Sequence, residues 1–191
     1  MNLKKLFDMQ KKLDEKILER FPHLRNEDLL PKKILALQVE IGELCNCWRG
    51  FKFWSHDQVP RTRVLVNRTT DDIGFKNIGP EHIKNPLLEE YVDCLHFILS
   101  IGLELGITDV AIDSDYTHED PTITFIHLFS DAWDLFADYY PDRYEKKEIY
   151  EIMFNRFIGL GEKHLGFTWE QIEEAYYRKN EINHARQVNK Y

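Results

Sequence analysis

The stretch Ala36-Leu37-Gln38-Val39-Glu40-Ile41-Gly42-Glu43-Leu44-Cys45 decides the fold, because it predicts the middle of a helix over residues 30–49. Glu40 and Glu43 are three residues apart, so their carboxylates lie on the same side of that helix. Such a pair alone is a weak indicator of a metal site, since most acidic pairs lie on solvated faces. The main apolar stripe of the helix is expected at Ile34, Gln38, Ile41, Cys45 and Trp48.

A second stretch, Leu88-Glu89-Glu90-Tyr91-Val92-Asp93-Cys94-Leu95-His96-Phe97, repeats the arrangement with Glu90 and Asp93. Asn85-Pro86 begins this helix, and Gly106 follows its expected end near Leu105. Four ionised carboxylates between two packed helices would repel each other unless a cation compensates them. Oxygen ligands alone select hard ions such as Mg²⁺ or Mn²⁺. The sequence therefore predicts a metal site formed by Glu40, Glu43, Glu90 and Asp93.

The composition is typical of one folded domain covering residues 1–191. The chain has 191 residues, 43% of them hydrophobic, and a net charge of −8, which argues against a general nucleic-acid-binding face. An acidic protein that takes a phosphorylated substrate needs a bound metal or a local basic patch. Three cysteines without Cys-x-x-Cys spacing indicate reduced thiols and a cytoplasmic location. No run resembles a signal-peptide core or is long enough to span a membrane.

The remaining periodicity predicts an all-α fold, a helical bundle of about six helices with a non-helical excursion around residues 55–84. That excursion is expected to be a mobile flap or an interface element. A helix is predicted over residues 3–20. Further helices are predicted to begin at Pro86 and at Pro121, another is predicted to end at about His164, and the last follows a Thr168–Gln171 capping box. The helix from Pro121 is expected to bury Ile123, Ile126, Ser130, Trp133 and Ala137, with Trp133 and Phe136 in the core.

Polar side chains interrupt two apolar stripes. Gln10 lies within the stripe of the first helix, with Asp14 one turn later. The stripe of the last helix changes into donors, namely Lys179, Asn180, Asn183 and Arg186. These donors indicate either a solvated helix end or groups that project over metal-bound phosphates, for which Lys and Arg are well suited.

Four motifs occur in order along the chain: Glu-x-x-Glu at 40–43, Trp-Arg-Gly-Phe-Lys-Phe-Trp at 48–54, Glu-x-x-Asp-x-x-His-Phe at 90–97, and Tyr-x-x-Lys-Asn-x-x-Asn-x-x-Arg-Gln at 176–187. This order resembles the dimeric all-α dUTPases, which belong to the wider all-α nucleoside triphosphate pyrophosphatases that include MazG-like proteins. The acidic pairs are shared by that whole superfamily, whereas the last motif points to dUTPase.

The resemblance implies a role for each matching residue. Glu40, Glu43, Glu90 and Asp93 would bind Mg²⁺, with Mn²⁺ as a substitute. Phosphates would be bound by Lys52, Lys179, Asn183 and Arg186, and the nucleoside by Gln10, Asp14, Trp54, Phe97 and Asn180. Two departures stand out: Asp14 replaces an expected Asn, and Asn189-Lys190-Tyr191 replaces a Gly-Tyr tail.

The implied reaction is metal-assisted hydrolysis of dUTP to dUMP and pyrophosphate by a dUTP diphosphatase that also accepts dUDP. Glu43 is expected to orient or deprotonate the attacking water. A buried amide such as Gln10 would exclude cytosine, and an aromatic wall at Trp54 or Phe97 would exclude the methyl group of thymine. The resemblance and the aromatic content of 13% also imply a homodimer.

Three alternatives remain open from the sequence. The same fold serves dCTP hydrolases and broad-specificity MazG-like pyrophosphatases. Asp93-x-x-His96 superficially suits a di-iron carboxylate bundle, but the helix carrying Glu40 and Glu43 lacks the histidine which that class requires. The chain could also be a non-catalytic helical partner protein with its acids on the surface.

Overall fold

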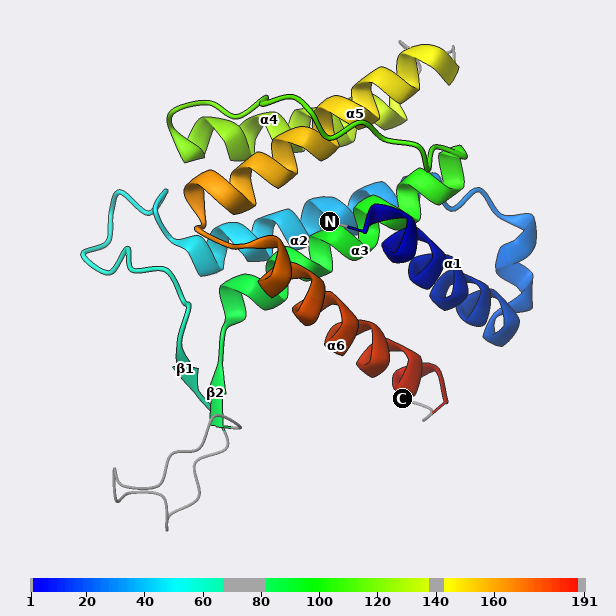
Figure 1. Ribbon diagram of the computed structural model, residues 1–191, viewed down its shortest axis with the longest axis horizontal. Coiled ribbons are helices and arrows are strands. Elements are labelled where there is room, and N and C mark those ends of the chain that lie inside the picture. Colours follow the sequence, from blue (N-terminus) through cyan, green and yellow to red (C-terminus); the bar gives the residue numbers. More distant parts are fainter. Residues whose placement is uncertain (1, 67–81, 138–142, 189–191) are drawn as a thin grey trace.

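The polypeptide folds almost entirely into helices, whose ends follow the capping residues in the sequence (Figure 1). The structure, a computed structural model, describes residues 2–66, 82–137 and 143–188. Within these residues the all-α prediction is confirmed. The elements are α1 (Leu3–Arg20), η1 (Pro22–Asn26), α2 (Leu30–Trp48), β1 (Val64–Leu65), β2 (Ile83–Lys84), α3 (Pro86–Leu105), α4 (Pro121–Phe136), α5 (Arg143–Gly159), the π-helical turn η4 (Leu160–His164) and α6 (Trp169–Val188).

Side-chain caps fix the predicted helix ends. The side-chain oxygen of Asn85 accepts from the Leu88 amide at 3.1 Å and begins α3. Thr168 and Gln171 form the expected capping box: the Thr168 amide donates to Gln171 Oε1 at 2.9 Å, and the Gln171 amide donates to Thr168 Oγ1 at 3.4 Å. Gly106 ends α3 in the left-handed conformation. These local bonds explain why the helix boundaries could be predicted closely.

The α2–α3 pair forms the centre of the molecule. These two helices pack against each other along their lengths, with α4 and α5 on one side and α1 and α6 on the other (Figure 1). α1 and α6 both contact α3, and they also contact each other. None of the described helices is both long and apolar enough to cross a membrane. The two acid-bearing stretches therefore face each other inside the bundle.

The predicted buried face of α2 is partly wrong. Leu37 and Leu44 are fully buried there, in place of the expected Gln38 and Cys45, which are half-buried. The full buried set is Ile34, Leu37, Ile41, Leu44 and Trp48.

The predicted buried face of α4 is wrong at its centre. Ile126 and Trp133 are 56% and 52% exposed, and Phe136 is also exposed. The helix instead buries Thr124, Phe125, Leu128, Asp131, Ala132 and Leu135. Its buried Asp131 forms an ion pair with Arg156 of α5. Because α4 carries apolar residues all around, periodicity could not reveal that a face containing an aspartate would be the inner one.

The described part of the 55–84 excursion contains a small antiparallel pair. Val64 pairs with Lys84 and Leu65 with Ile83. Arg61 ties this segment to the core, because its amide donates to the Cys47 carbonyl and its carbonyl accepts from the Leu87 amide. The β1–β2 pair extends away from the helices (Figure 1). Residues 67–81 lie outside the described residues, so the choice between flap and interface element stays a prediction.

Two helical glycines offer a matched test of packing between α3 and its neighbours. A Cβ on Gly102 would lie 2.8 Å from the Ile107 carbonyl oxygen and would also meet Tyr150, whose hydroxyl is fixed by donation to the Ile98 carbonyl. We expect Gly102→Ala to lower the free energy of unfolding by about 1–3 kcal/mol through overpacking. A Cβ on Gly42 would meet no described residue outside its own stretch of helix within 4 Å, so Gly42→Ala should raise the free energy of unfolding by about 0.5–1 kcal/mol through helix propensity. Urea unfolding of both variants checks the pair, and equal effects would contradict it.

Candidate active site

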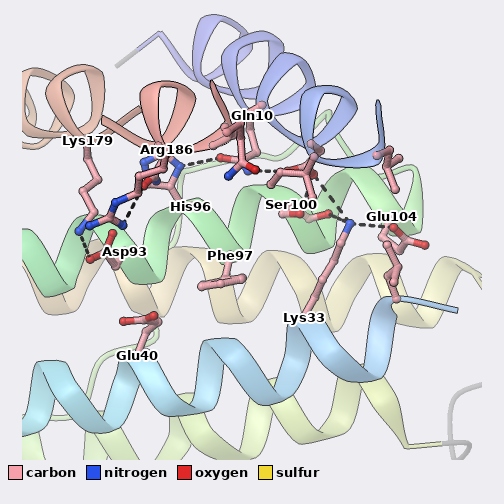
Figure 2. Close-up of a pocket in the computed structure, with 17 residues that line it drawn as sticks. Gln10, Lys33, Glu40, Asp93, His96, Phe97, Ser100, Glu104, Lys179 and Arg186 are labelled. Carbon is pink, nitrogen blue, oxygen red and sulfur yellow. Dashed lines mark hydrogen bonds and ion pairs between the residues drawn. The ribbon is translucent and has the colours of Figure 1, made fainter. Parts of the chain in front are cut away.

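Three carboxylates meet where α2 and α3 pack. Glu40 comes from α2, and Glu90 and Asp93 come from α3. One oxygen of each carboxylate lies within 4.8 Å of the others. Figure 2 shows Glu40 and Asp93 facing each other across the interface. The structure therefore brings together three of the four predicted metal ligands, which we call the acid cluster (Glu40, Glu90 and Asp93).

Burial and mutual repulsion disfavour negative charge in the acid cluster. The pKa of both Glu40 and Glu90 is raised to about 7, mainly because burial removes hydration and also because the neighbouring carboxylates, Asp93 and Glu43 among them, repel a negative charge. Burial also raises the pKa of Asp93, although a hydrogen bond from Lys179 lowers it. A cation placed between these oxygens would remove the repulsion, so the cluster has the electrostatic character of a divalent-metal site.

Glu43, the fourth predicted ligand, lies outside the acid cluster. It is one turn after Glu40 on α2, and its side chain is exposed. It is still close enough that its charge raises the pKa of both Glu40 and Glu90. Glu43 thus borders the cluster on a side that water can reach.

A cavity of about 430 Å³ begins at the acid cluster and runs between α1, α2, α3 and α6. Polar groups lie at both of its ends, and apolar side chains including Phe97 lie between them (Figure 2). The residues that line it are Gln10, Leu13, Asp14, Ile17, Leu18, Leu29, Lys33, Glu40, Asp93, His96, Phe97, Ser100, Glu104, Lys179, Asn183, Arg186 and Gln187. Its amphipathic lining suits a ligand with a flat apolar part and a charged part.

Gln10 is the centre of a buried hydrogen-bond network. Its Oε1 accepts from the Tyr176 hydroxyl at 2.9 Å and lies 2.7 Å from His96 Nδ1, and its Nε2 donates to Asp14 Oδ1 at 2.7 Å. Burial lowers the pKa of His96 to about 3, so this ring is neutral and donates through Nδ1. Because both polar atoms of Gln10 already have partners, its clearest role in the structure is to position the Asp14 carboxylate.

Asp14 and Lys33 form the polar end of the cavity farthest from the acid cluster. Ser100 Oγ donates to Asp14 Oδ2 at 2.6 Å, and Lys33 Nζ lies 3.8 Å from the same oxygen. Lys33 also donates to Glu104 at 2.7 Å and to the Ser100 carbonyl at 3.3 Å. Burial raises the pKa of Asp14, while the bond from Ser100 and the charge of Lys33 lower it. A carboxylate and an ammonium group therefore lie side by side at this end.

The end beside the acid cluster carries cations from α6. Lys179 Nζ donates to Asp93 Oδ2 at 2.5 Å, and Arg186 donates to Asn183 at 3.4 Å. Figure 2 shows Lys179 and Arg186 projecting from α6 toward Asp93 on α3. Carboxylates and cations thus share one end of one cavity, an arrangement that could hold a divalent cation together with phosphate oxygens.

The sequence matches a model of a known protein family. A family model described as dUTPase matches residues 2–79 and 71–191. The chain belongs to the all-α dUTPase family. A search of curated proteins finds no match. The family assignment makes this protein an enzyme that hydrolyses dUTP, and it confirms the resemblance drawn from the motifs.

Three residues predicted to contact the nucleotide do not line the cavity of this dUTPase. Trp54 is 65% exposed, and Lys52 lies beside the Phe51 ring in the same loop after α2. Asn180 is buried next to Tyr176, and its Nδ2 has no partner among the described residues. The tail residues 189–191 lie outside the described part of the chain.

Five polar residues that line the cavity were not predicted as site residues, namely Lys33, His96, Ser100, Glu104 and Gln187. Lys33 lies seven residues before Glu40, and Ser100 lies seven residues after Asp93, so both share a helical face with a predicted ligand. That spacing could have revealed them. His96 stands within the quoted motif, and Glu104 lies one turn after Ser100.

Proposed function

We propose that this dUTPase requires Mg²⁺, with Mn²⁺ as a substitute, and converts dUTP to dUMP and pyrophosphate. The proposal includes dUDP as a second substrate. The observation that carries it is the acid cluster at the cationic end of an amphipathic cavity. The uracil base would fit the apolar middle and the polar far end of the cavity, and the phosphates would fit between the carboxylates and the cations.

The donor set fits magnesium. Glu40, Glu90 and Asp93 offer oxygen ligands only, which is the set that hard divalent cations prefer. The di-iron alternative needs imidazole ligands, but among the described residues the group that could hold a metal ion contains no histidine. When bound, Mg²⁺ would neutralise phosphate oxygens and make a water molecule more acidic.

The proposed hydrolysis is a displacement at the α-phosphorus. A water oxygen forms a bond to this phosphorus, and the bond to the bridging oxygen breaks. Pyrophosphate then leaves with the electron pair. Glu43 accepts the proton from the attacking water, since it is exposed and borders the acid cluster. Lys179, Asn183 and Arg186 hold the phosphate oxygens.

We also propose a homodimer in a reducing, cytoplasmic setting. Exposed apolar side chains include Leu35 and Val39 on α2, and Ile126, Trp133 and Phe136 on α4. Apolar surface of this kind is typical of a subunit interface. The cysteines Cys45, Cys47 and Cys94 are all free thiols. Light scattering in solution measures the subunit number directly.

A substrate comparison tests the proposed function. Hydrolysis rates of dUTP, dUDP, dCTP and dTTP are measured with Mg²⁺ and with EDTA. We expect dUTP to be the best triphosphate, dUMP and pyrophosphate to be the products, and EDTA to abolish turnover. If dCTP were the best substrate, the uracil assignment would be wrong. Turnover that is independent of metal would contradict the role of the acid cluster.

The acid cluster predicts a pH-dependent effect of magnesium on stability. Because the native pKa of Glu40 and Glu90 is about 7, above the ordinary value of 4.5, the native protein binds more protons than the unfolded chain between these pH values. These groups therefore make the metal-free protein less stable as pH rises from about 4.5 to 7. We expect Mg²⁺ to have little effect at pH 5. At pH 8, 100 Kd of Mg²⁺ should raise the free energy of unfolding by about 2.7 kcal/mol. Urea unfolding at both pH values checks this, and equal stabilisation would contradict it.

A further inference from the structure

A second hollow continues the cavity on the other side of the cations of α6. It has a volume of about 520 Å³ and lies between β2, the start of α3, and α6. We call it the α3–α6 hollow. Lys179 and Arg186 line both this hollow and the nucleotide cavity, so the two spaces adjoin at these side chains.

The hollow lies beside the acid cluster and extends past it toward the start of α3. Ser100 and Asp93 line the nucleotide cavity, whereas Glu89 and Asn85 line the hollow. A helix rises 1.5 Å per residue, so Asp93 and Asn85 are about 12 Å apart along the axis of α3. The hollow spans α3 from Asn85 to Val92, so it lies beside Glu90 on a neighbouring face of the helix and extends toward the start of α3. Outer phosphates of a nucleotide whose α-phosphate lies at the acid cluster could reach the hollow past Lys179 and Arg186, which line both spaces.

The charge of the hollow is opposite to that of the protein as a whole. Two cations, Lys84 of β2 and Arg178 of α6, line it in addition to Lys179 and Arg186, and Glu89 is its acidic residue. Lys84 is exposed, and Arg178 forms a long surface ion pair with Glu174, at 3.7 Å, which holds it weakly. In a chain with a net charge of −8, this is a local basic patch of the kind that a phosphorylated ligand requires.

We propose that the α3–α6 hollow binds inorganic pyrophosphate and the pyrophosphate end of the nucleotide substrate, with Lys84 and Arg178 as its anion-binding residues. This inference rests on the proposed function, which places the α-phosphate at the acid cluster. A lysine of β2 and an arginine of α6 both line the hollow, and their N–H donors suit phosphate oxygens. The hollow would hold the leaving group after cleavage and would make pyrophosphate an inhibitor.

The test compares two double variants that remove the same charge. Lys84→Gln with Arg178→Gln changes the hollow, and Lys4→Gln with Lys11→Gln changes two exposed lysines of α1 beside a different hollow. Binding of inorganic pyrophosphate with Mg²⁺ is measured by calorimetry, with inorganic phosphate and dUMP as further probes. The inhibition constant of pyrophosphate against dUTP hydrolysis is measured in parallel.

We expect the hollow variant to weaken pyrophosphate binding at least about tenfold, because it loses two charged donors, while dUMP binding stays unchanged. The KM for dUTP should rise, and the α1 variant should match the wild type. Unchanged pyrophosphate affinity in the hollow variant, or equal weakening in both variants, would overturn the inference. If the wild type binds pyrophosphate in this way but does not hydrolyse dUTP, the subsite stands and the proposed function fails.

Discussion

Glu90→Gln is expected to lower kcat for dUTP hydrolysis on the order of a thousandfold, because it removes a charged ligand from the proposed metal site. Glu90 lies in the acid cluster with Glu40 and Asp93. The amide keeps the shape of the side chain but provides a neutral oxygen, which binds a hard cation more weakly. Less charge would then be available to neutralise the phosphates in the transition state. Steady-state kinetics at several Mg²⁺ concentrations measures the loss.

Stability separates this loss of activity from a loss of folding. Since Glu90→Gln removes a carboxylate whose charge is disfavoured by burial and by repulsion from Asp93, Glu43 and Glu40, the metal-free variant should be at least as stable as the wild type at pH 8. Glu148→Gln is the matched control, because Glu148 is exposed on α5 and does not line the cavity. A Glu90→Gln enzyme with normal activity would rule out this carboxylate as a metal ligand.

The sequence predicted the helix ends and the acidic positions of the site well, because these features depend on residues that are close together in the chain. Helix ends depend on caps such as Asn85 and Thr168, and ligand placement depends on the three-residue spacing of Glu90 and Asp93. Each of these is set within a turn or two of one helix. That locality explains why the bundle and the helix boundaries agree with the structure, and why three of the predicted ligands lie close together.

What the sequence could not predict depends on contacts between helices. The inner face of α4 is decided by the ion pair of Asp131 with Arg156, which no periodicity reveals. The apparent base reader Gln10 has its polar atoms occupied by His96, Tyr176 and Asp14. These partners are far apart in the chain, so only the packed structure shows that the polar groups facing the cavity are those around Asp14.

The Asp14–Lys33 end of the cavity provides the second large effect, on base selection. An ionised carboxylate only accepts hydrogen bonds and an ammonium group only donates them. Uracil presents an N3–H donor between two carbonyl acceptors, whereas N3 of cytosine is an acceptor. Asp14 can therefore accept from N3–H while Lys33, 3.8 Å from its Oδ2, donates to the adjoining carbonyl. The same pair would place acceptor against acceptor at N3 of cytosine.

Lys33→Met should lower kcat/KM for dUTP by about 10–150-fold, which is the effect of losing one hydrogen bond from a charged donor. Because the charge of Lys33 lowers the pKa of Asp14, its removal favours the protonated carboxyl group. A protonated Asp14 can donate to N3 of cytosine, so kcat/KM for dCTP should rise. The ratio of kcat/KM for dUTP to that for dCTP should therefore fall by a larger factor than kcat/KM for dUTP itself. The two rates are measured at the same pH and Mg²⁺ concentration.

The neighbouring lysine is the control for this effect. Lys32 is exposed, its ammonium group pairs with Glu27, and it does not line the cavity, so Lys32→Met should leave both rates near those of the wild type. Removing Lys33 also leaves Glu104 without its 2.7 Å partner, so urea unfolding of both variants is compared. A purely structural role for Lys33 would reduce the dUTP and dCTP rates by the same factor. Only a change in their ratio supports base reading, because destabilisation does not distinguish the two nucleotides.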